Sequence, residues 1–251
     1  PTPVQAEAIP LILEGGDLIA VAQTGTGKTL AFTLPTITHI VNNPTEGTRM
    51  LILVPTRELC VQVHRVVEDM ANAAHLTTAL VYGGVGYENQ TKALRKGAHI
   101  VIATPGRLLD HIDQRNANFK NLTTLILDEA DRMLDMGFLP DVKHIINALP
   151  KKRQTLMFSA TFQDGIARLA QNMMHEPEKI VLGIIAKPVD AVTQKLFPVL
   201  PELKMRLIGD ILTEADPESC MIFLRTKVRT DQLAEMLKNK GWKVTQIHGD
   251  R

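Results

Sequence analysis

Cysteine is nearly absent from this chain of 251 residues, which contains only Cys60 and Cys220. Two cysteines so far apart, without a CxxC pair, form neither a disulfide framework nor a zinc site, and they fit a reducing cytoplasm. No apolar run approaches the roughly 18 residues of a membrane-spanning helix, and no signal-peptide pattern opens the chain. The sequence therefore predicts a cytoplasmic protein without a membrane segment.

Aromatic residues and net charge are also scarce. Aromatics make up 4% of the chain, and the formal net charge is +1. A platform that stacks bases needs more aromatic side chains, and a field that attracts polyanions over the whole surface needs more positive charge. Any nucleic-acid contact must therefore come from a local patch. The eight histidines show no metal-binding spacing, and we find no internal repeat.

Hydrophobic residues are plentiful, at 45%, which suits one large or two smaller domains. Strand and helix patterns alternate, which predicts an α/β fold with a doubly wound parallel sheet. The strands that we expect are at 18–21, 49–54, 78–82, 99–103, 124–127 and 154–158. Polar clusters follow these strands directly, at the sheet edge where such folds bind ligands.

The alternation loosens near residue 183 and resumes near residue 193. We therefore expect a first domain at 1–182, a linker at 183–192 and a second, partial domain at 193–251. The second part predicts strands at 193–199, 220–224 and 243–247 and helices at 202–213 and 230–239. Because the chain stops directly after a strand-like segment, we interpret it as a fragment of something longer.

Residues 22–29 read Ala-Gln-Thr-Gly-Thr-Gly-Lys-Thr and stand between a predicted strand and a predicted helix. Glycines there let backbone N–H groups converge on phosphate oxygens at a helix N-terminus. Lys28 would reach the β- and γ-phosphates, and the Thr29 hydroxyl would bind Mg²⁺. The nucleotide-binding residues that we expect in this loop are Gln23, Thr24, Gly25, Thr26, Gly27, Lys28 and Thr29. The alternative is an ordinary Gly/Thr-rich turn, and Ala22 departs from the Gly of the general motif.

Gln5 has two interpretations. It stands three residues after Thr2, where a capping box places Glu or Gln, and Pro3 suits the first helical position. Its amide also carries one donor and one acceptor, which is what an adenine edge requires. Local spacing alone favours the cap.

Asp128 and Glu129 follow a buried strand and are the expected partners of the loop. One carboxylate would bind Mg²⁺, and the other would orient or deprotonate the attacking water. An acidic helix start, favoured by the helix dipole, is the alternative. Together with the loop, the metal interpretation is preferred.

The chain resembles the DEAD-box ATP-dependent RNA helicases, a P-loop NTPase family with RecA-like domains. The motifs that carry the resemblance occur in the family's order, and they are Gln5, 22–29, 55–59, 83–84, 104–107, 128–131 and 159–161. This family has Ala at the first position of the loop, so Ala22 supports the resemblance. Segments 221–226 and 247–250 fit the start of a second RecA-like domain.

The resemblance implies roles for the matched residues. Gln5 would select adenine, and Lys28, Asp128 and Glu129 would be catalytic, with Mg²⁺ on Thr29 and Asp128. Asp131, Ser159 and Thr161 would couple the nucleotide site to an RNA site. The residues that would line the RNA sugar-phosphate backbone are Pro55, Thr56, Arg57, Gly84, Thr104, Gly106 and Arg107. Without the resemblance, Arg57 and Arg107 would count as solvated surface residues.

The predicted function is thus ATP-dependent RNA binding and local duplex unwinding, with ATP and Mg²⁺ required. The family's arginine-finger motifs would lie beyond residue 251, so we expect slow turnover and no unwinding by this chain. One rival function is a nucleotide-gated RNA clamp that does not unwind. A DNA translocase is disfavoured because Gln5 and 128–131 match the RNA family. The RNA substrate and protein partners do not follow from the sequence.

Overall fold

The structure is a computed structural model that describes residues 1–182 and 193–250. The chain divides into two compact units, Pro1–Lys187 and Pro188–Arg251. The predicted linker, 183–192, lies outside the described residues.

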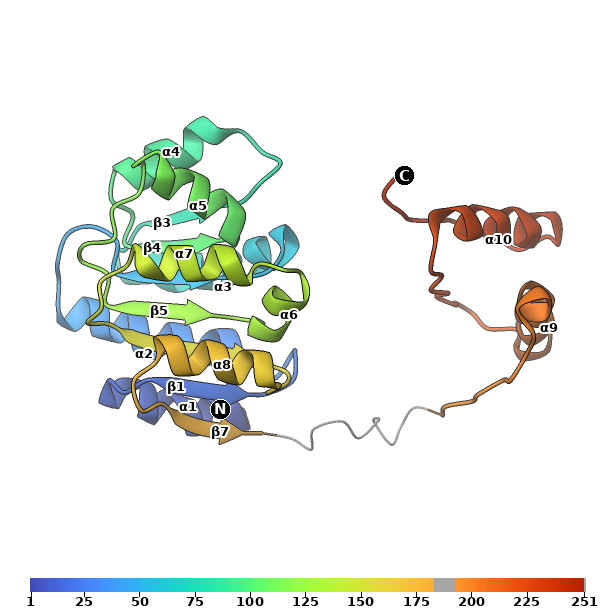
Figure 1. The fold of residues 1–251 in the computed structure, drawn as a ribbon, viewed down its shortest axis with the longest axis horizontal. Coiled ribbons are helices and arrows are strands. Elements are labelled where there is room, and N and C mark those ends of the chain that lie inside the picture. Colours follow the sequence, from blue (N-terminus) through green and yellow to red (C-terminus); the bar gives the residue numbers. More distant parts are fainter. Residues whose placement is uncertain (183–192, 251) are drawn as a thin grey trace. The chain divides into compact units, whose positions relative to one another are not determined.

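The first unit is built around a seven-stranded sheet in the order β3-β4-β2-β5-β6-β1-β7 (Figure 1). Every strand pair in it is parallel. The strands are β1 (Leu18–Val21), β2 (Met50–Leu53), β3 (Thr78–Val81), β4 (Ile100–Ala103), β5 (Thr124–Leu127), β6 (Gln154–Ser159) and β7 (Glu178–Val181). The first six coincide with the predicted strands to within one residue at each end, which confirms the doubly wound parallel sheet.

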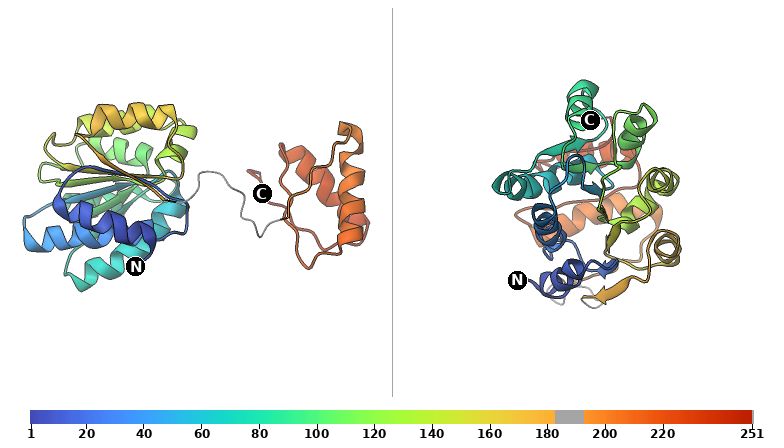
Figure 2. Two further views of the ribbon diagram at one scale, coloured as in Figure 1. Left: turned by 90° about the horizontal axis from the view of Figure 1, so that it is seen from below. Right: turned by 90° about the vertical axis from the view of Figure 1, so that its left-hand side faces the viewer.

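Helices cover both faces of this sheet (Figure 2). One face packs against α1 (Pro3–Glu14), α2 (Lys28–Asn42) and α3 (Arg57–Ala73). The other packs against α4 (Tyr87–Arg95), α5 (Pro105–Asp113), α6 (Ala130–Asp135), α7 (Leu139–Asn147) and α8 (Asp164–Met173). The sheet is therefore the middle layer of three, and its two faces carry separate apolar clusters.

The strand sequences explain the burial. In β2, Leu51 and Leu53 join one apolar cluster while Met50 and Ile52 join the other. Side chains alternate between the two faces, and a parallel sheet covered on both sides buries them all. A nearly continuous run of apolar residues is typical of a strand that is buried on both faces. The central strands could therefore be predicted from the sequence.

Two elements of the first unit were not predicted. The helix α8 buries Ile166, Leu169 and Ala170. The strand β7 lies at the sheet edge, and its residues are exposed except for the half-buried Ile180. An edge strand that starts with Glu178 and Lys179 lacks the apolar run of a central strand, so its sequence does not distinguish it from a loop.

The second unit contains the short 3₁₀ helix η1 (Pro201–Leu203), α9 (Lys204–Ala215) and α10 (Lys227–Asn239). Its two predicted helices are confirmed: α9 begins and ends two residues later than expected, and α10 begins three residues earlier than expected. The three predicted strands are wrong, because no residue within 193–250 is assigned to a strand. A strand needs a neighbour for its backbone hydrogen bonds, and within 193–250 no backbone hydrogen bond joins 220–224 to 243–247. Ile222, Leu224 and Val244 nevertheless pack against the two helices.

Candidate functional site

The loop between β1 and α2 has the backbone that a phosphate-binding loop requires. Gly25 (φ 81°) and Gly27 (φ 93°) adopt the left-handed conformation that glycine reaches without steric cost. The N–H of Ala22 donates to the carbonyl of Ser159 at 2.9 Å, which fastens the start of the loop to the end of β6. Lys28 is buried, and its Nζ donates to the carbonyl of Ala22 at 3.2 Å. The ammonium group therefore lies within the loop, where α2 begins.

Gln5 connects α1 to this loop. Its Oε1 accepts from the backbone N–H of Thr2 at 3.0 Å, which is the capping contact that local spacing favoured. Its Nε2 donates to the carbonyl of Gly27 at 3.2 Å. A Cβ on Gly27 would come within 2.6 Å of that nitrogen, so a larger residue there would displace the Gln5 amide. The capping role of Gln5 is confirmed, and its adenine role stays a prediction.

Asp128 lies at the end of β5 with only 3% of its surface exposed. Burial raises the pKa of its carboxyl to about 6, and the nearby positive charge of Lys28 partly offsets that effect. The fold therefore brings together two buried, oppositely charged residues from separate predicted motifs. A buried carboxylate of this kind is stabilised in its ionised form by a bound cation.

Glu129 adopts a left-handed backbone conformation (φ 53°), which costs a non-glycine residue about 1 kcal/mol. Its N–H donates to Oδ1 of Asp128 at 3.0 Å, and its Oε2 pairs with Nη1 of Arg132 at 3.2 Å. The residue occupies the N-cap position of α6, so the acidic helix start is confirmed, and its catalytic role stays a prediction. Backbone strain of this kind, next to a buried carboxylate, is typical of functional sites.

Asp131, Ser159 and Thr161 form one hydrogen-bonded group. Oδ2 of Asp131 accepts from the N–H of Thr161 at 2.9 Å and from its hydroxyl at 3.0 Å. The N–H of Asp131 donates to Oγ of Ser159 at 3.3 Å. The segment after β5 is thereby fixed to the segment after β6. The contact between the predicted coupling residues is present, and their coupling role stays a prediction.

The predicted RNA residues occupy the other half of the same sheet edge, after β2, β3 and β4. Thr56 caps α3 by accepting from the N–H of Leu59 at 3.2 Å. The Arg57 guanidinium lies directly against Gly84. Arg107 donates from Nη1 to the carbonyl of Val85 at 3.2 Å. Pro55 and Thr104 lie in the connections that follow β2 and β4, and Gly106 lies in the first turn of α5. The strand order thus divides the edge into two halves. The half formed by β5-β6-β1 is called the nucleotide half because its residues are predicted to bind nucleotide, and β3-β4-β2 form the second half.

Comparison with known proteins identifies the family. A family model described as DEAD/DEAH box helicase matches residues 2–169, which is more than half of the chain. The chain belongs to the DEAD/DEAH box helicase family. The residues predicted for the nucleotide, RNA and coupling sites all lie within the matched stretch, and Asp128-Glu129-Ala130-Asp131 spells the family's signature.

Relatives within the family extend over the whole chain. ATP-dependent RNA helicase CshA of Listeria monocytogenes is 43% identical over 99% of this chain and 48% of its own length. DEAD-box ATP-dependent RNA helicase 20 of Oryza sativa is 39% identical over all of this chain and 52% of its own length. The chain therefore spans about half the length of the curated relatives it matches. A solved DEAD box protein from Methanococcus jannaschii aligns with a TM-score of 0.69 and 38% identity, covering this chain fully and 67% of its own. That likeness confirms the predicted RecA-like fold.

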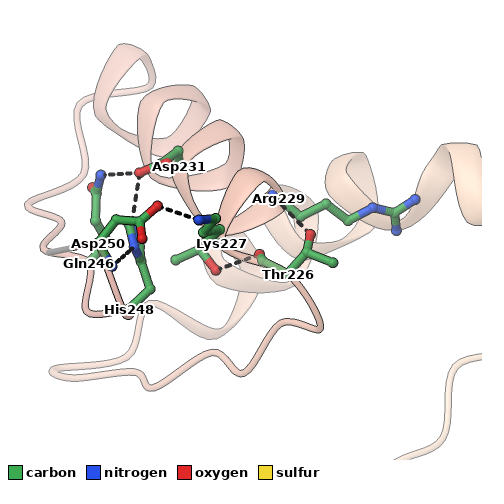
Figure 3. Close-up of polar contacts among 8 residues, drawn as sticks. Thr226, Lys227, Arg229, Asp231, Gln246, His248 and Asp250 are labelled. Atoms are coloured by element: carbon green, nitrogen blue, oxygen red, sulfur yellow. Dashed lines mark hydrogen bonds and ion pairs between the residues drawn. The ribbon is translucent and has the colours of Figure 1, made fainter.

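The second unit of this DEAD/DEAH box protein has a polar network of its own (Figure 3). Oδ1 of Asp231 accepts from Nε2 of Gln246 at 2.7 Å and lies 3.1 Å from Nε2 of His248. Lys227 forms an ion pair with Asp250. These contacts fix segment 246–250 to α10. The contact of His248 with Asp231 is made within the unit.

Two kinds of feature are absent from the described residues. In 1–182 and 193–250, no helix has the length and hydrophobicity needed to cross a bilayer. Across the same residues, no three His, Cys, Asp or Glu side chains are grouped as a metal site.

Proposed function

We propose that the protein is an ATP-dependent RNA helicase, of which this chain carries the nucleotide-binding domain and part of a second domain. The observation that carries the proposal is the hydrogen-bonded group of Asp131, Ser159 and Thr161. It lies beside the buried Lys28 and Asp128 and on the same sheet edge as Arg57 and Arg107. Two ligand sites on one edge, joined by such a group, suit a protein in which one ligand changes the binding of the other.

The nucleotide half provides separate groups for binding and for chemistry. Lys28, already inside the loop, would hold the β- and γ-phosphates. Thr29 and Asp128 would hold Mg²⁺, which neutralises developing charge on the phosphates when bound. Glu129 would orient the attacking water and accept its proton. The raised pKa of Asp128 favours this assignment because a cation would repay the desolvation of the carboxylate.

The second half suits the sugar-phosphate backbone of RNA. Arg57 and Arg107 supply charge, and the hydroxyl of Thr104 and the backbone around Gly84 supply hydrogen-bonding groups of small size. Such contacts position a strand without reading its sequence. RNA is also named as the substrate of the relatives described above. We place the protein in the cytoplasm on the strength of its two unpaired cysteines.

Two substitutions test the assignment of the nucleotide half. Lys28→Ala should weaken ATP binding because Lys28 meets phosphate charge in the ground state. Glu129→Gln should leave ATP affinity within about twofold and slow hydrolysis by about 10²-fold or more, as expected for loss of a general base. Affinity is measured with a fluorescent ATP analogue, hydrolysis by phosphate release, and Glu14→Gln on the exposed end of α1 is the control. If Glu129→Gln hydrolyses ATP as fast as the parent chain, its proposed role is wrong.

RNA binding is tested separately. Binding of single-stranded RNA, measured by fluorescence anisotropy, should depend on ATP and Mg²⁺ and should weaken in Arg57→Ala. Equal RNA affinity with and without nucleotide would contradict the coupling between the two halves.

A further inference from the structure

We infer that Tyr87 is a positioning residue for Arg107, and that the buried ring of His111 supports Tyr87 in this role. The inference rests on the proposed function, because Arg107 is one of the residues assigned there to the RNA backbone. Tyr87 and His111 were not singled out by the sequence, and neither belongs to a motif that carried the resemblance.

The three side chains form a continuous stack. The Tyr87 and His111 rings lie 4.0 Å apart between centroids, with 16° between their planes. The guanidinium carbon of Arg107 lies over the Tyr87 ring, 5.2 Å from its centroid. Arg107 and His111 are four residues apart on α5 and therefore share one face of that helix. Tyr87, the first residue of α4, is the common partner of both.

Arg107 is consequently held at two points. The guanidinium carbon lies over the Tyr87 ring, and Nη1 donates to the carbonyl of Val85. Val85 and Tyr87 both belong to the segment that follows Gly83-Gly84, so the stack also connects that segment to α5. An arginine fixed in this way loses less conformational entropy when it binds a phosphate than a freely rotating one.

The polar atoms of the Tyr87 and His111 rings do not stabilise the fold. The hydroxyl of Tyr87 is buried without a hydrogen-bond partner, and so are both ring nitrogens of His111. Buried polar atoms without partners destabilise a fold, and apolar side chains would avoid the cost. The two residues contribute through their ring faces, which stack on each other and lie next to the guanidinium of Arg107. Burial and the charge of Arg107 lower the pKa of His111, opposed in part by Asp110, so the imidazole is neutral beside the arginine.

The experiment compares three single variants and one double variant in RNA binding. Tyr87→Phe keeps the ring and removes the unpartnered hydroxyl, so it should bind RNA as the parent does and melt at the same or a higher temperature. Tyr87→Leu removes the ring face and should bind RNA about three- to fivefold more weakly, the range expected for one exposed cation–π contact. In the Arg107→Ala background, Tyr87→Leu should have no further effect, because its action passes through Arg107. A stack that served only stability would give no such dependence.

The outcomes separate the inference from the proposed function. Weaker RNA binding by Arg107→Ala together with parent-like binding by Tyr87→Leu would overturn the inference and leave the role of Arg107 standing. Parent-like binding by Arg107→Ala would overturn both. If Tyr87→Leu does not fold, Arg107→Lys provides the test. Lysine keeps the positive charge but lacks the guanidinium group that lies over the Tyr87 ring. Parent-like RNA affinity of Arg107→Lys would then overturn the inference.

Discussion

The guanidinium of Arg57 occupies the space that a side chain at residue 84 would need. A Cβ built on Gly84 would overlap Nη1 and Cζ of Arg57, and Gly84 itself has a left-handed backbone (φ 84°). Arg57 and Gly84 belong to separate motifs that were both predicted to line RNA. The absence of a side chain at Gly84 leaves the space that the Arg57 guanidinium fills.

Gly84→Ala should displace the Arg57 guanidinium and weaken RNA binding several-fold. The strained backbone should also lower the free energy of unfolding by about 1–2 kcal/mol. Gly83→Ala is the matched control, because a Cβ there meets Nη2 of Arg57 at an ordinary 3.8 Å and the backbone needs no positive φ. RNA anisotropy and thermal melting provide the two measurements. Equal effects of the two substitutions would show that the fit between Gly84 and Arg57 is not important.

Nucleotide choice is expected to depend on Gln5. The parent chain should bind ATP and ADP more tightly than GTP, because guanine reverses the donor and acceptor polarity at its 6-position. Gln5→Ala should remove this preference and, through loss of the capping contact with Thr2, cost about 1 kcal/mol of stability. Gln171→Ala on the exposed face of α8 serves as the control. Equal ATP and GTP affinity in the parent chain would exclude the adenine role.

Gln5→Glu separates the capping contact from the contact with the loop. One carboxylate oxygen can still accept from the N–H of Thr2, while the other would face the carbonyl of Gly27 in place of a donating Nε2. We therefore expect Gln5→Glu to bind ATP more weakly than the parent while α1 stays intact by circular dichroism. Parent-like ATP affinity would mean that the Gly27 contact does not shape the loop.

Asp128 should make the stability of the metal-free protein depend on pH. Its folded-state pKa of about 6 lies above the ordinary value of 3.8, so folding disfavours the ionised form. The parent is therefore destabilised as pH rises through 6, by up to about 3 kcal/mol for a shift of this size. Asp128→Asn should be the more stable protein at pH 8 in the presence of a chelator, and the difference should disappear near pH 4. A difference that stays constant with pH would argue against this titration.

Hydrogen exchange should differ between the two units. Amides of 51–54 and 125–127 belong to central strands that are paired on both sides, and they should exchange slowly. Amides of 222–224 have no ladder partner within 193–250, and Met221 and Phe223 are 79% and 88% exposed. These amides should exchange much faster. Equal protection of the two sets would contradict the difference in pairing.

The predictable part of the fold is the part in which local pattern and burial agree. A central strand such as β2 is apolar on both faces, and each motif follows its strand at the carboxyl end. The strand order, which separates Lys28 and Asp128 from Arg57 and Arg107, depends on long-range pairing that no local pattern contains. The same holds for the stack of Tyr87 on His111, which joins two helices. The predicted strand at 220–224 fails for the same reason. Its residues have the apolar pattern of a strand, but within 193–250 no neighbouring strand pairs with them.

The edge strand β7 has a mechanical consequence. Its one neighbour in the described sheet is β1, and the pair is closed at both ends by hydrogen bonds from Glu178 to Asp17 and from Leu182 to Val21. The described part of the first unit ends at Leu182, and loop 22–29, which is predicted to bind nucleotide, begins directly after Val21. Tension along β7 would load these hydrogen bonds in shear, so a pull on Leu182 would be borne by β1, the strand that leads into loop 22–29.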